Sequence, residues 1–191
     1  QLNVSDDPAA NLVVTREMLA DAAAQGAEFV LTPEVSNCIS TSRDHQQSVL
    51  HHEPEDPTLA ALRSDAAVLG VWVLIGSLGL KTGNADGRFA NRSFLIDPQG
   101  GIAASYDKIH MFDVQVTPTE TWKESAAYRP GAQAVIAQTP FAKIGMAICY
   151  DVRFPALFQA LADAGAQILT VPAAFSPVTG AAHWHTLLRA R

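Results

Sequence analysis

The clearest structural signal in this chain is Lys143-Ile-Gly-Met-Ala-Ile-Cys-Tyr-Asp-Val-Arg-Phe-Pro155. Its apolar run from Ile144 to Ile148 predicts a short buried strand, and Pro155 can occupy the first turn of a following helix. Cys149 then falls on the sharp turn between them, where backbone N–H groups could lower the pKa of its thiol and bind an oxyanion. This setting predicts a displayed nucleophile, although a lone cysteine at a strand end is also compatible with a small buried hydrophobic residue.

Composition places the chain among ordinary globular proteins. It has 191 residues, of which 48% are hydrophobic and 17% charged. The net charge of −6 and the scattered basic residues argue against a nucleic-acid surface, and no apolar segment is long enough to span a bilayer. Because Cys38 and Cys149 are the only cysteines, we expect no disulfide framework and a cytoplasmic location.

Both ends of the sequence resemble cut edges. Gln1 to Val4 resembles the tail of a strand, and the helical pattern from His183 to Arg191 stops without a terminating Gly, Asn or Pro. We therefore expect a fragment of a longer chain. Since no repeat or linker interrupts residues 1–191, we expect a single, incomplete domain.

Local patterns predict an alternation of helices and strands. The expected helices run from Asp7-Pro8 to Gly26, from Pro57 to Gly70 and from Pro155 to Ala164. The expected strands are Phe29–Leu31, Val71–Leu78, the hairpin Ser93–Asp97 with Ile102–Tyr106, Ala134–Ala137 and Gln167–Val171. Residues 36–55, with one helical turn, and 114–131 are expected to be loops. Together these elements predict an α/β fold with a mixed sheet and helices on at least one face, with Val71–Leu78 buried on both faces.

Three chemically useful residues follow predicted strands. Glu34, Lys108 and Cys149 each come just after a strand, and the carboxyl ends of neighbouring strands meet at one edge of an α/β sheet. A thiol that attacks a carbonyl needs a base and an oxyanion donor, which a carboxylate and a lysine can supply. Taken singly, a glutamate or lysine at a strand end is equally consistent with a solvated charge.

Four segments make the catalytic interpretation more specific. They are Thr32-Pro-Glu34, Tyr106-Asp-Lys-Ile-His110 with Phe112-Asp113, Lys123-Glu-Ser125 before Pro130-Gly131, and Gly145 to Pro155. In order and spacing they resemble the signature segments of the nitrilase superfamily of carbon–nitrogen hydrolases. The resemblance covers nearly the whole chain and implies an α-β-β-α sandwich whose monomers pair through helices near the active site, giving a homodimer or a higher homo-oligomer.

The resemblance also implies a role for each site residue. Glu34, Lys108 and Cys149 would form the catalytic triad, and Glu124 would complete the site, with Glu120 nearby as the alternative. Glu34 would act as the base, Lys108 and the Tyr150 N–H would stabilise the oxyanion, and Cys149 would carry a thioester. We expect two carboxylates beside Lys108 to keep it charged and to raise the pKa of one carboxylate.

The segments after the cysteine indicate a substrate class. Pro172–Phe175 and Thr179–Trp184 resemble the branch that contains omega-amidases and deaminated glutathione amidases, which implies a small-molecule substrate with the terminal amide of a 2-oxo acid, or of a peptide such as deaminated glutathione that carries one. The candidate substrate-binding residues are Arg153, Phe175, Thr179 and His183. Arg153 can clamp a substrate carboxylate, or it can pair with Asp151 and only hold the turn.

Other interpretations remain open. The same site can serve a nitrile or N-carbamoyl hydrolase or an N-acyltransferase, and a non-catalytic binding domain can keep a relic triad. We expect no metal and no other cofactor, because His51-His52 and His183/His185 lack the spacing and partners of a zinc site. No nucleic-acid or membrane partner is expected. Cys38 is expected to be a bystander, because no strand-to-turn context displays it.

Overall fold

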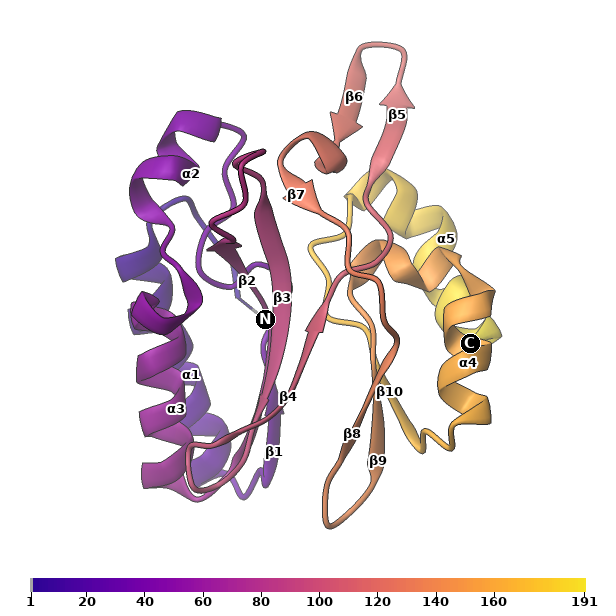
Figure 1. Ribbon diagram of the computed structural model, residues 1–191. Helices are drawn as coiled ribbons and strands as arrows, with labels where there is room; N and C mark the ends of the chain where they lie inside the picture. Colours follow the sequence, from indigo (N-terminus) through magenta and orange to yellow (C-terminus); the bar gives the residue numbers. More distant parts are fainter. Residues whose placement is uncertain (1) are drawn as a thin grey trace.

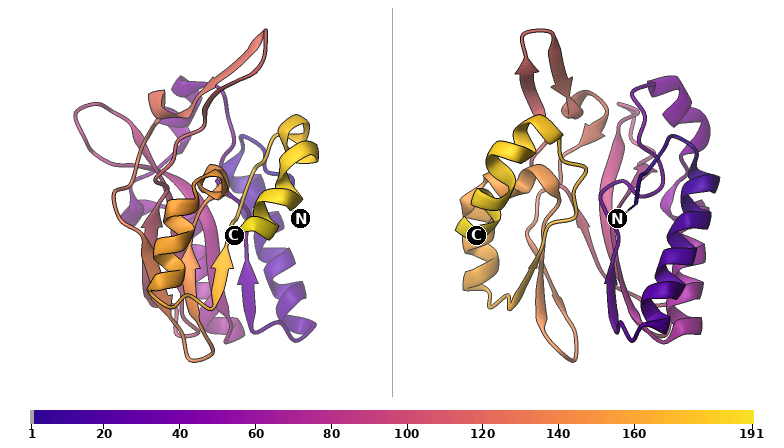
Figure 2. Two further views of the ribbon diagram at one scale, coloured as in Figure 1. Left: turned by 90° about the vertical axis from the view of Figure 1, so that its right-hand side faces the viewer. Right: turned by 180° about the vertical axis from the view of Figure 1, so that it is seen from behind.

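The computed structural model describes residues 2–191 as two β-sheets that face each other, with helices on the outer face of each (Figures 1 and 2). The α-helices are α1 Pro8–Ala24, α2 Arg43–Val49, α3 Pro57–Leu69, α4 Pro155–Asp163 and α5 Pro177–Ala190. The strands are β1 Phe29–Leu31, β2 Trp72–Lys81, β3 Phe89–Ile96, β4 Ile102–Asp107, β5 Asp113–Thr117, β6 Glu120–Lys123, β7 Tyr128–Arg129, β8 Val135–Gln138, β9 Lys143–Met146 and β10 Ile168–Thr170. Three short 3-10 helices are η1 Glu53–Glu55, η2 Glu124–Ala126 and η3 Cys149–Arg153.

The larger sheet has the strand order β1-β2-β3-β4, and β7 pairs with β3. β1 and β2 are parallel, whereas β2, β3 and β4 form an antiparallel meander. β4 therefore runs in the same direction as β1, so the segments that follow both strands emerge at the same edge of the sheet. The smaller sheet has the order β10-β9-β8, and the β5–β6 hairpin projects away from both sheets (Figure 1).

The apolar core is divided into layers. Between the sheets, side chains from the larger sheet meet side chains from the smaller one; they include Leu74, Leu95, Tyr106, Ile144, Met146 and Ile148. α1 and α3 cover the outside of the larger sheet, and α4 covers the smaller sheet. Because each sheet buries one face on the other sheet and one on helices, every residue from 73 to 80 in β2 is buried, as predicted. This arrangement confirms the α-β-β-α sandwich.

Local capping explains the boundaries of the first helices. Asp7 caps α1 by accepting hydrogen bonds from the N–H groups of Ala9 and Ala10, and Asp56 caps α3 through the N–H of Leu59. α3 ends at Gly70, whose φ of 68° is a left-handed conformation that glycine adopts without strain. These elements match the predicted ones to within about two residues, which is the usual uncertainty of a helix end.

Several predicted elements were wrong. The residue patterns alone predicted one mixed sheet, but the strands divide between two. The expected loop 36–55 contains the seven-residue helix α2 as well as η1, and the expected loop 114–131 contains a β-hairpin. α5 begins at Pro177, before the predicted start at His183. The exposed hairpin and α2, which buries only Gln46, have little apolar periodicity to reveal them.

None of the helices formed by residues 2–191 is sufficiently long and apolar to cross a membrane.

Candidate active site

Glu34 lies in the loop that follows β1. This loop crosses closely over β2, where Gly76 N–H donates to Thr32 Oγ1 at 3.0 Å. A Cβ atom on Gly76 would lie 1.9 Å from the Thr32 carbonyl oxygen, so only glycine allows this approach. The N–H of Val35 donates to Ser77 Oγ at 2.8 Å. β2, whose pairing with β3 shifts register between Ile75 and Leu78, thus fixes the backbone on both sides of Glu34.

Lys108 directly follows β4. Its N–H donates to the Asn91 carbonyl oxygen at 3.0 Å, and its own carbonyl oxygen accepts from Gly131 N–H at 2.8 Å. A Cβ atom on Gly131 would lie 2.3 Å from the Asp107 carbonyl oxygen. The lysine backbone is therefore held between the centre of the larger sheet and the segment that returns from the β5–β6 hairpin.

Cys149 is the first residue of η3, three positions after β9 ends. Its N–H donates to the Pro172 carbonyl oxygen at 2.9 Å, and its φ is 48°. Val35, next to Glu34, has a φ of 49°, and no other non-glycine residue within 2–191 has a positive φ. Such backbone costs about 1–3 kcal/mol and concentrates at functional sites. One strained residue is therefore the predicted nucleophile itself, and the other is the neighbour of the predicted base.

A buried aspartate connects the cysteine turn to the lysine strand. One carboxylate oxygen of Asp151 accepts hydrogen bonds from Ile148 N–H at 2.8 Å and from Tyr106 Oη at 2.7 Å. The other oxygen accepts from His110 N–H at 3.0 Å and lies 2.7 Å from His110 Nδ1. Tyr106 and His110 flank Lys108 in the sequence, so Asp151 links the two segments that carry the lysine and the thiol.

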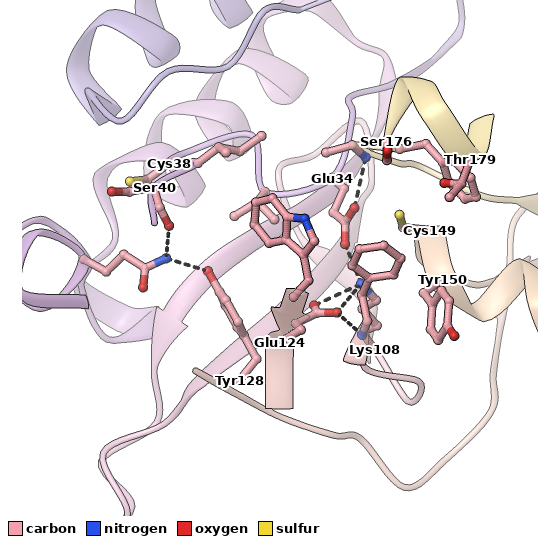
Figure 3. A pocket seen from close by; sticks show the side chains of 17 residues that line it. Glu34, Cys38, Ser40, Lys108, Glu124, Tyr128, Cys149, Tyr150, Ser176 and Thr179 are labelled. Atoms are coloured by element: carbon pink, nitrogen blue, oxygen red, sulfur yellow. Dashed lines mark hydrogen bonds and ion pairs between the residues drawn. The ribbon is translucent and has the colours of Figure 1, made fainter. Parts of the chain in front are cut away.

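The structure brings the four predicted catalytic side chains together. Lys108 Nζ lies 2.8 Å from Glu34 Oε1 and 2.8 Å from Glu124 Oε2, and the Cys149 sulfur lies beside this group (Figure 3). Glu34 Oε2 also accepts the Ala174 N–H at 3.0 Å. These contacts identify Glu124 as the second glutamate of the cluster. Glu120 instead accepts a hydrogen bond from the Trp122 indole on the exposed hairpin.

Asn91 joins the same cluster, although sequence reasoning missed it. Its Nδ2 atom donates to Glu34 Oε1 at 3.0 Å and to Glu124 Oε1 at 3.2 Å. The side chain comes from the middle of β3 and is only 1% exposed. Asn91 lies two residues before the predicted strand Ser93–Asp97, whereas β3 begins at Phe89, so no sequence pattern marked this amide as buried.

At Lys108 and at Glu34, burial and the neighbouring opposite charges shift the pKa in opposite directions. Burial alone disfavours the Lys108 ammonium, but the Glu34 and Glu124 carboxylates outweigh it, so the Lys108 pKa is raised. The Glu34 pKa is lowered, because Lys108 and hydrogen bonds overcome the effect of burial. The expectation of a charged lysine is confirmed. Glu34, however, does not have the raised carboxylate pKa that was predicted for one of the two glutamates.

The prediction of a lowered thiol pKa is also wrong. Burial and the adjacent Glu34 carboxylate raise the pKa of Cys149 well above its usual value, although Lys108 opposes this shift. The resting site therefore holds a neutral thiol next to an ionised carboxylate. A thiol in this state becomes a nucleophile when a neighbouring base removes its proton during attack.

A cavity of about 210 Å³ opens onto Cys149, Glu34, Lys108 and Glu124. Much of its wall is aromatic, formed by Phe112, Trp122, Tyr128, Tyr150 and Phe175. Thr179 also lines the cavity, and its buried Oγ1 has no hydrogen-bond partner within the described residues. The cavity is large enough for a small molecule, and Ser40, Gln46 and Ser176 add neutral polar groups to its wall.

Two predicted substrate-binding residues are not in the cavity wall. Arg153 Nη2 lies 3.2 Å from His183 Nδ1, and the guanidinium is 5.8 Å from the centre of the Tyr150 ring and 5.7 Å from that of Phe175. Arg153 thus lies behind two rings that line the cavity. It does not pair with Asp151, whose oxygens are taken by Tyr106, His110 and Ile148.

Within residues 2–191, no three or more His, Cys, Asp or Glu side chains lie together in a cluster that could hold a metal ion.

Comparisons with known proteins agree with this arrangement. The carbon-nitrogen hydrolase family profile matches residues 1–191. A deaminated glutathione amidase from Yersinia enterocolitica is 41% identical over 87% of this chain and 58% of its own length, so this chain spans little more than half of that relative. The omega-amidase NIT2 of Danio rerio is 34% identical over 100% of this chain and 67% of its own length.

Solved structures show the same fold. The NitFhit protein of C. elegans matches 100% of this chain and 46% of its own, with 30% identity and a TM-score of 0.89. Nit3 of Saccharomyces cerevisiae, described as a member of branch 10 of the nitrilase superfamily, matches 100% of this chain and 68% of its own, with 28% identity and a TM-score of 0.84. The chain belongs to the carbon–nitrogen hydrolase family of the nitrilase superfamily.

Proposed function

We propose that this protein is an amidase that hydrolyses a carbon–nitrogen amide bond through a thioester on Cys149. The observation that carries the proposal is the buried Lys108 ammonium, held between Glu34 and Glu124 beside the thiol. Two of the relatives, a deaminated glutathione amidase and an omega-amidase, support the same reaction class.

In the acylation step, Glu34 removes the thiol proton while the Cys149 sulfur attacks the amide carbon. The carbonyl oxygen becomes an oxyanion, which Lys108 and the Tyr150 N–H stabilise. The carbon–nitrogen bond then breaks, and Glu34 returns the proton to the departing nitrogen, so that ammonia leaves. Because Glu34 has a lowered pKa, it is ionised and ready to accept this proton at neutral pH.

In the deacylation step, Glu34 takes a proton from water, and the resulting hydroxide attacks the thioester carbon. The carbon–sulfur bond breaks, the thiol recovers its proton, and the product is a carboxylic acid. Glu124 holds Lys108 in place through both of its carboxylate oxygens, at 2.9 and 2.8 Å, during both steps. Each cycle therefore consumes one amide and one water and releases one acid and one ammonia.

The proposed substrate is the terminal amide of a 2-oxo acid, or of deaminated glutathione. The names of the relatives support this class, and Thr179 Oγ1 offers an unpaired hydroxyl in the cavity wall. Arg153 is the proposed partner of the substrate carboxylate. It would reach the substrate through a side-chain rotation past Tyr150 and Phe175, leaving His183.

Ammonia release from a panel of compounds tests the proposal. The panel contains 2-oxoglutaramate, deaminated glutathione, a simple nitrile and an N-carbamoyl amino acid, with the full-length protein as enzyme. We expect ammonia from the first two and far slower release from the others. The absence of ammonia from every compound would contradict the proposed reaction, and preference for the nitrile or the carbamoyl compound would reassign the substrate class.

We further propose that residues 1–191 act as one domain of a cytoplasmic homodimer or higher homo-oligomer. α5 supports this assembly, because none of its residues is buried and Val178 is 62% exposed. Both cysteines are free, which supports a reducing compartment. Light scattering of the full-length protein should give a mass of at least two chains, and a monomer would contradict the proposed assembly.

A further inference from the structure

We propose that Asn91 is a positioning residue that fixes the spacing and ionisation of the two glutamates around Lys108. The proposal rests on the amidase function above and deepens it. Asn91 does not itself line the cavity and has no hydrogen bond to Cys149, so it acts on the reaction through Glu34 and Glu124, which do line it. No other neutral side chain within residues 2–191 donates hydrogen bonds to both carboxylates.

The geometry of the amide suits this task. Its Nδ2 atom has two N–H bonds, and the two carboxylates accept from it at 3.0 and 3.2 Å. Both acceptor atoms, Glu34 Oε1 and Glu124 Oε1, also accept from Lys108 Nζ. The ammonium and the amide thus bridge the same pair of oxygens. They hold two like charges close together in a buried site, where an unbridged pair would repel strongly.

The orientation of the amide is set by charge. Asn91 Oδ1 is buried and has no hydrogen-bond partner among the described residues. If the two ends of the amide were exchanged, Oδ1 would face two ionised carboxylates, which have no hydrogen to donate to it. An orphaned buried oxygen is unfavourable, so the two N–H bonds to the carboxylates are what hold the amide in this orientation.

The backbone of the same residue positions the lysine. Asn91 lies in β3, and its carbonyl oxygen accepts the Lys108 N–H at 3.0 Å. One residue in a central strand therefore orients Lys108 through its main chain and both glutamates through its side chain. The ionisation of Glu34 is influenced by Lys108, Cys149 and Tyr128 and by the Ala174 N–H, and Glu124 shares Lys108 Nζ with it.

Replacing the amide by an apolar group of similar size provides the first test. In Asn91→Leu, Glu34 loses a hydrogen bond that favours its ionised form, so its pKa should rise. Because Glu34 acts as a base only when ionised, the acidic limb of the kcat/KM profile should move to higher pH by about one unit. At neutral pH Glu34 stays ionised, but the two glutamates lose their fixed spacing, so we also expect kcat there to fall about 10- to 100-fold, with a smaller change in KM.

Asn91→Asp provides a second variant of almost identical shape. At low pH its carboxyl group is protonated and can donate to one glutamate, so activity should be closest to that of the wild type there. As the pH rises, the introduced carboxyl group ionises and faces two other carboxylates, and activity should be lost. The alkaline limb should therefore move to lower pH, which is opposite in direction to the shift of the acidic limb in Asn91→Leu.

Asn37→Leu is the matched control. Asn37 is equally buried, at 1% exposure, but its amide pairs with the backbone of Gly79 and does not contact the carboxylates. This variant should lose stability and keep the wild-type pH limbs. Unchanged pH limbs in both folded Asn91 variants, or an equal shift in Asn37→Leu, would overturn the positioning role.

A readout without substrate separates this proposal from the amidase proposal. Iodoacetamide alkylates the thiol, and peptide mass spectrometry measures the rate at Cys149 alone. Because Glu34 is the base for this thiol, the alkylation profile of Asn91→Leu should move to higher pH even if no tested amide is hydrolysed. If the alkylation profile shifts but no amide yields ammonia, the positioning role of Asn91 stands and the amidase proposal fails. If the wild type and Asn91→Leu have identical alkylation profiles, the positioning role is contradicted.

Discussion

The two sheets hold their parts of the site by different means. The larger sheet carries Glu34, Asn91 and Lys108, whose side chains bond directly to one another and to Glu124. The smaller sheet carries Cys149, whose position comes from its backbone, through the bond to Pro172 and a strained φ of 48°. The charged groups are thus fixed by attraction between opposite charges, whereas the nucleophile is fixed by a turn.

This difference has a chemical consequence. A charged cluster that is already satisfied needs no rearrangement when charge develops on a substrate oxygen, which favours electrostatic stabilisation of the transition state. The thiol has a raised pKa and stays neutral until Glu34 takes its proton. Asp151 bonds to residues of both sheets, so it sets the distance between the two parts.

The largest expected effect comes from removing the nucleophile. Cys149→Ala should lower turnover at least 10³-fold, because no other group can form the thioester, and the far-UV circular dichroism should remain that of the folded protein. Cys38→Ala is the matched control, since Cys38 is also buried and lines the same cavity, but its thiol bonds to the Asp6 carbonyl oxygen and not to the charged cluster. Undiminished ammonia release by Cys149→Ala would remove this cysteine from the mechanism.

An intermediate effect is expected at the connection between the sheets. Asp151→Asn replaces one accepting oxygen by an NH₂ group, which cannot accept from Ile148 N–H or Tyr106 Oη. Losing a hydrogen bond to a charged acceptor should destabilise the fold by about 1.5–3 kcal/mol and lower kcat about 10- to 100-fold. Denaturant unfolding and steady-state kinetics measure the two changes.

Tyr106→Phe removes only one of these bonds and should have a smaller effect on both. If Asp151→Asn loses stability but keeps the wild-type kcat, the aspartate supports the fold without setting the catalytic distance.

The smallest expected effect is on acid stability. The pKa of Glu34 is lower in the folded protein than its ordinary value, so the unfolded chain binds more protons at acidic pH. The stability that Glu34 contributes is present above the ordinary carboxyl pKa and is lost as the pH falls through the lowered value. Chemical unfolding between pH 7 and pH 3 should show a shallower decline in Glu34→Gln than in the wild type, and equal slopes would show that this carboxylate is not coupled to folding.

Sequence patterns located the larger sheet and the turn at Cys149 because these parts have strong local signals. β2 is a long apolar run, α3 is bounded by Asp56 and Gly70, and Pro155 marks the start of α4. Glu34, Lys108 and Cys149 were identified from their places after strands. Only the family resemblance separated the strands into two sheets, since a strand buried on both faces reads the same in either arrangement.

Properties that depend on three-dimensional neighbours could not be predicted. Asn91 lies 57 residues from Glu34 and 33 from Glu124, so nothing local connects it with them. The raised pKa of Cys149 follows from burial and from Glu34, neither of which is visible at the turn itself. Arg153 was a reasonable clamp by position, but the direction of its side chain places it behind Tyr150 and Phe175.

The most direct test of the central claim is to trap the acyl-enzyme. The full-length protein is mixed with an amide that it hydrolyses, quenched in acid within one turnover, digested and examined by mass spectrometry. We predict that the peptide containing Cys149 gains the mass of the amide minus ammonia, as ammonia is released at one equivalent per site. Release of that equivalent with an unmodified Cys149 peptide, or with the acyl group on another residue, would contradict the account.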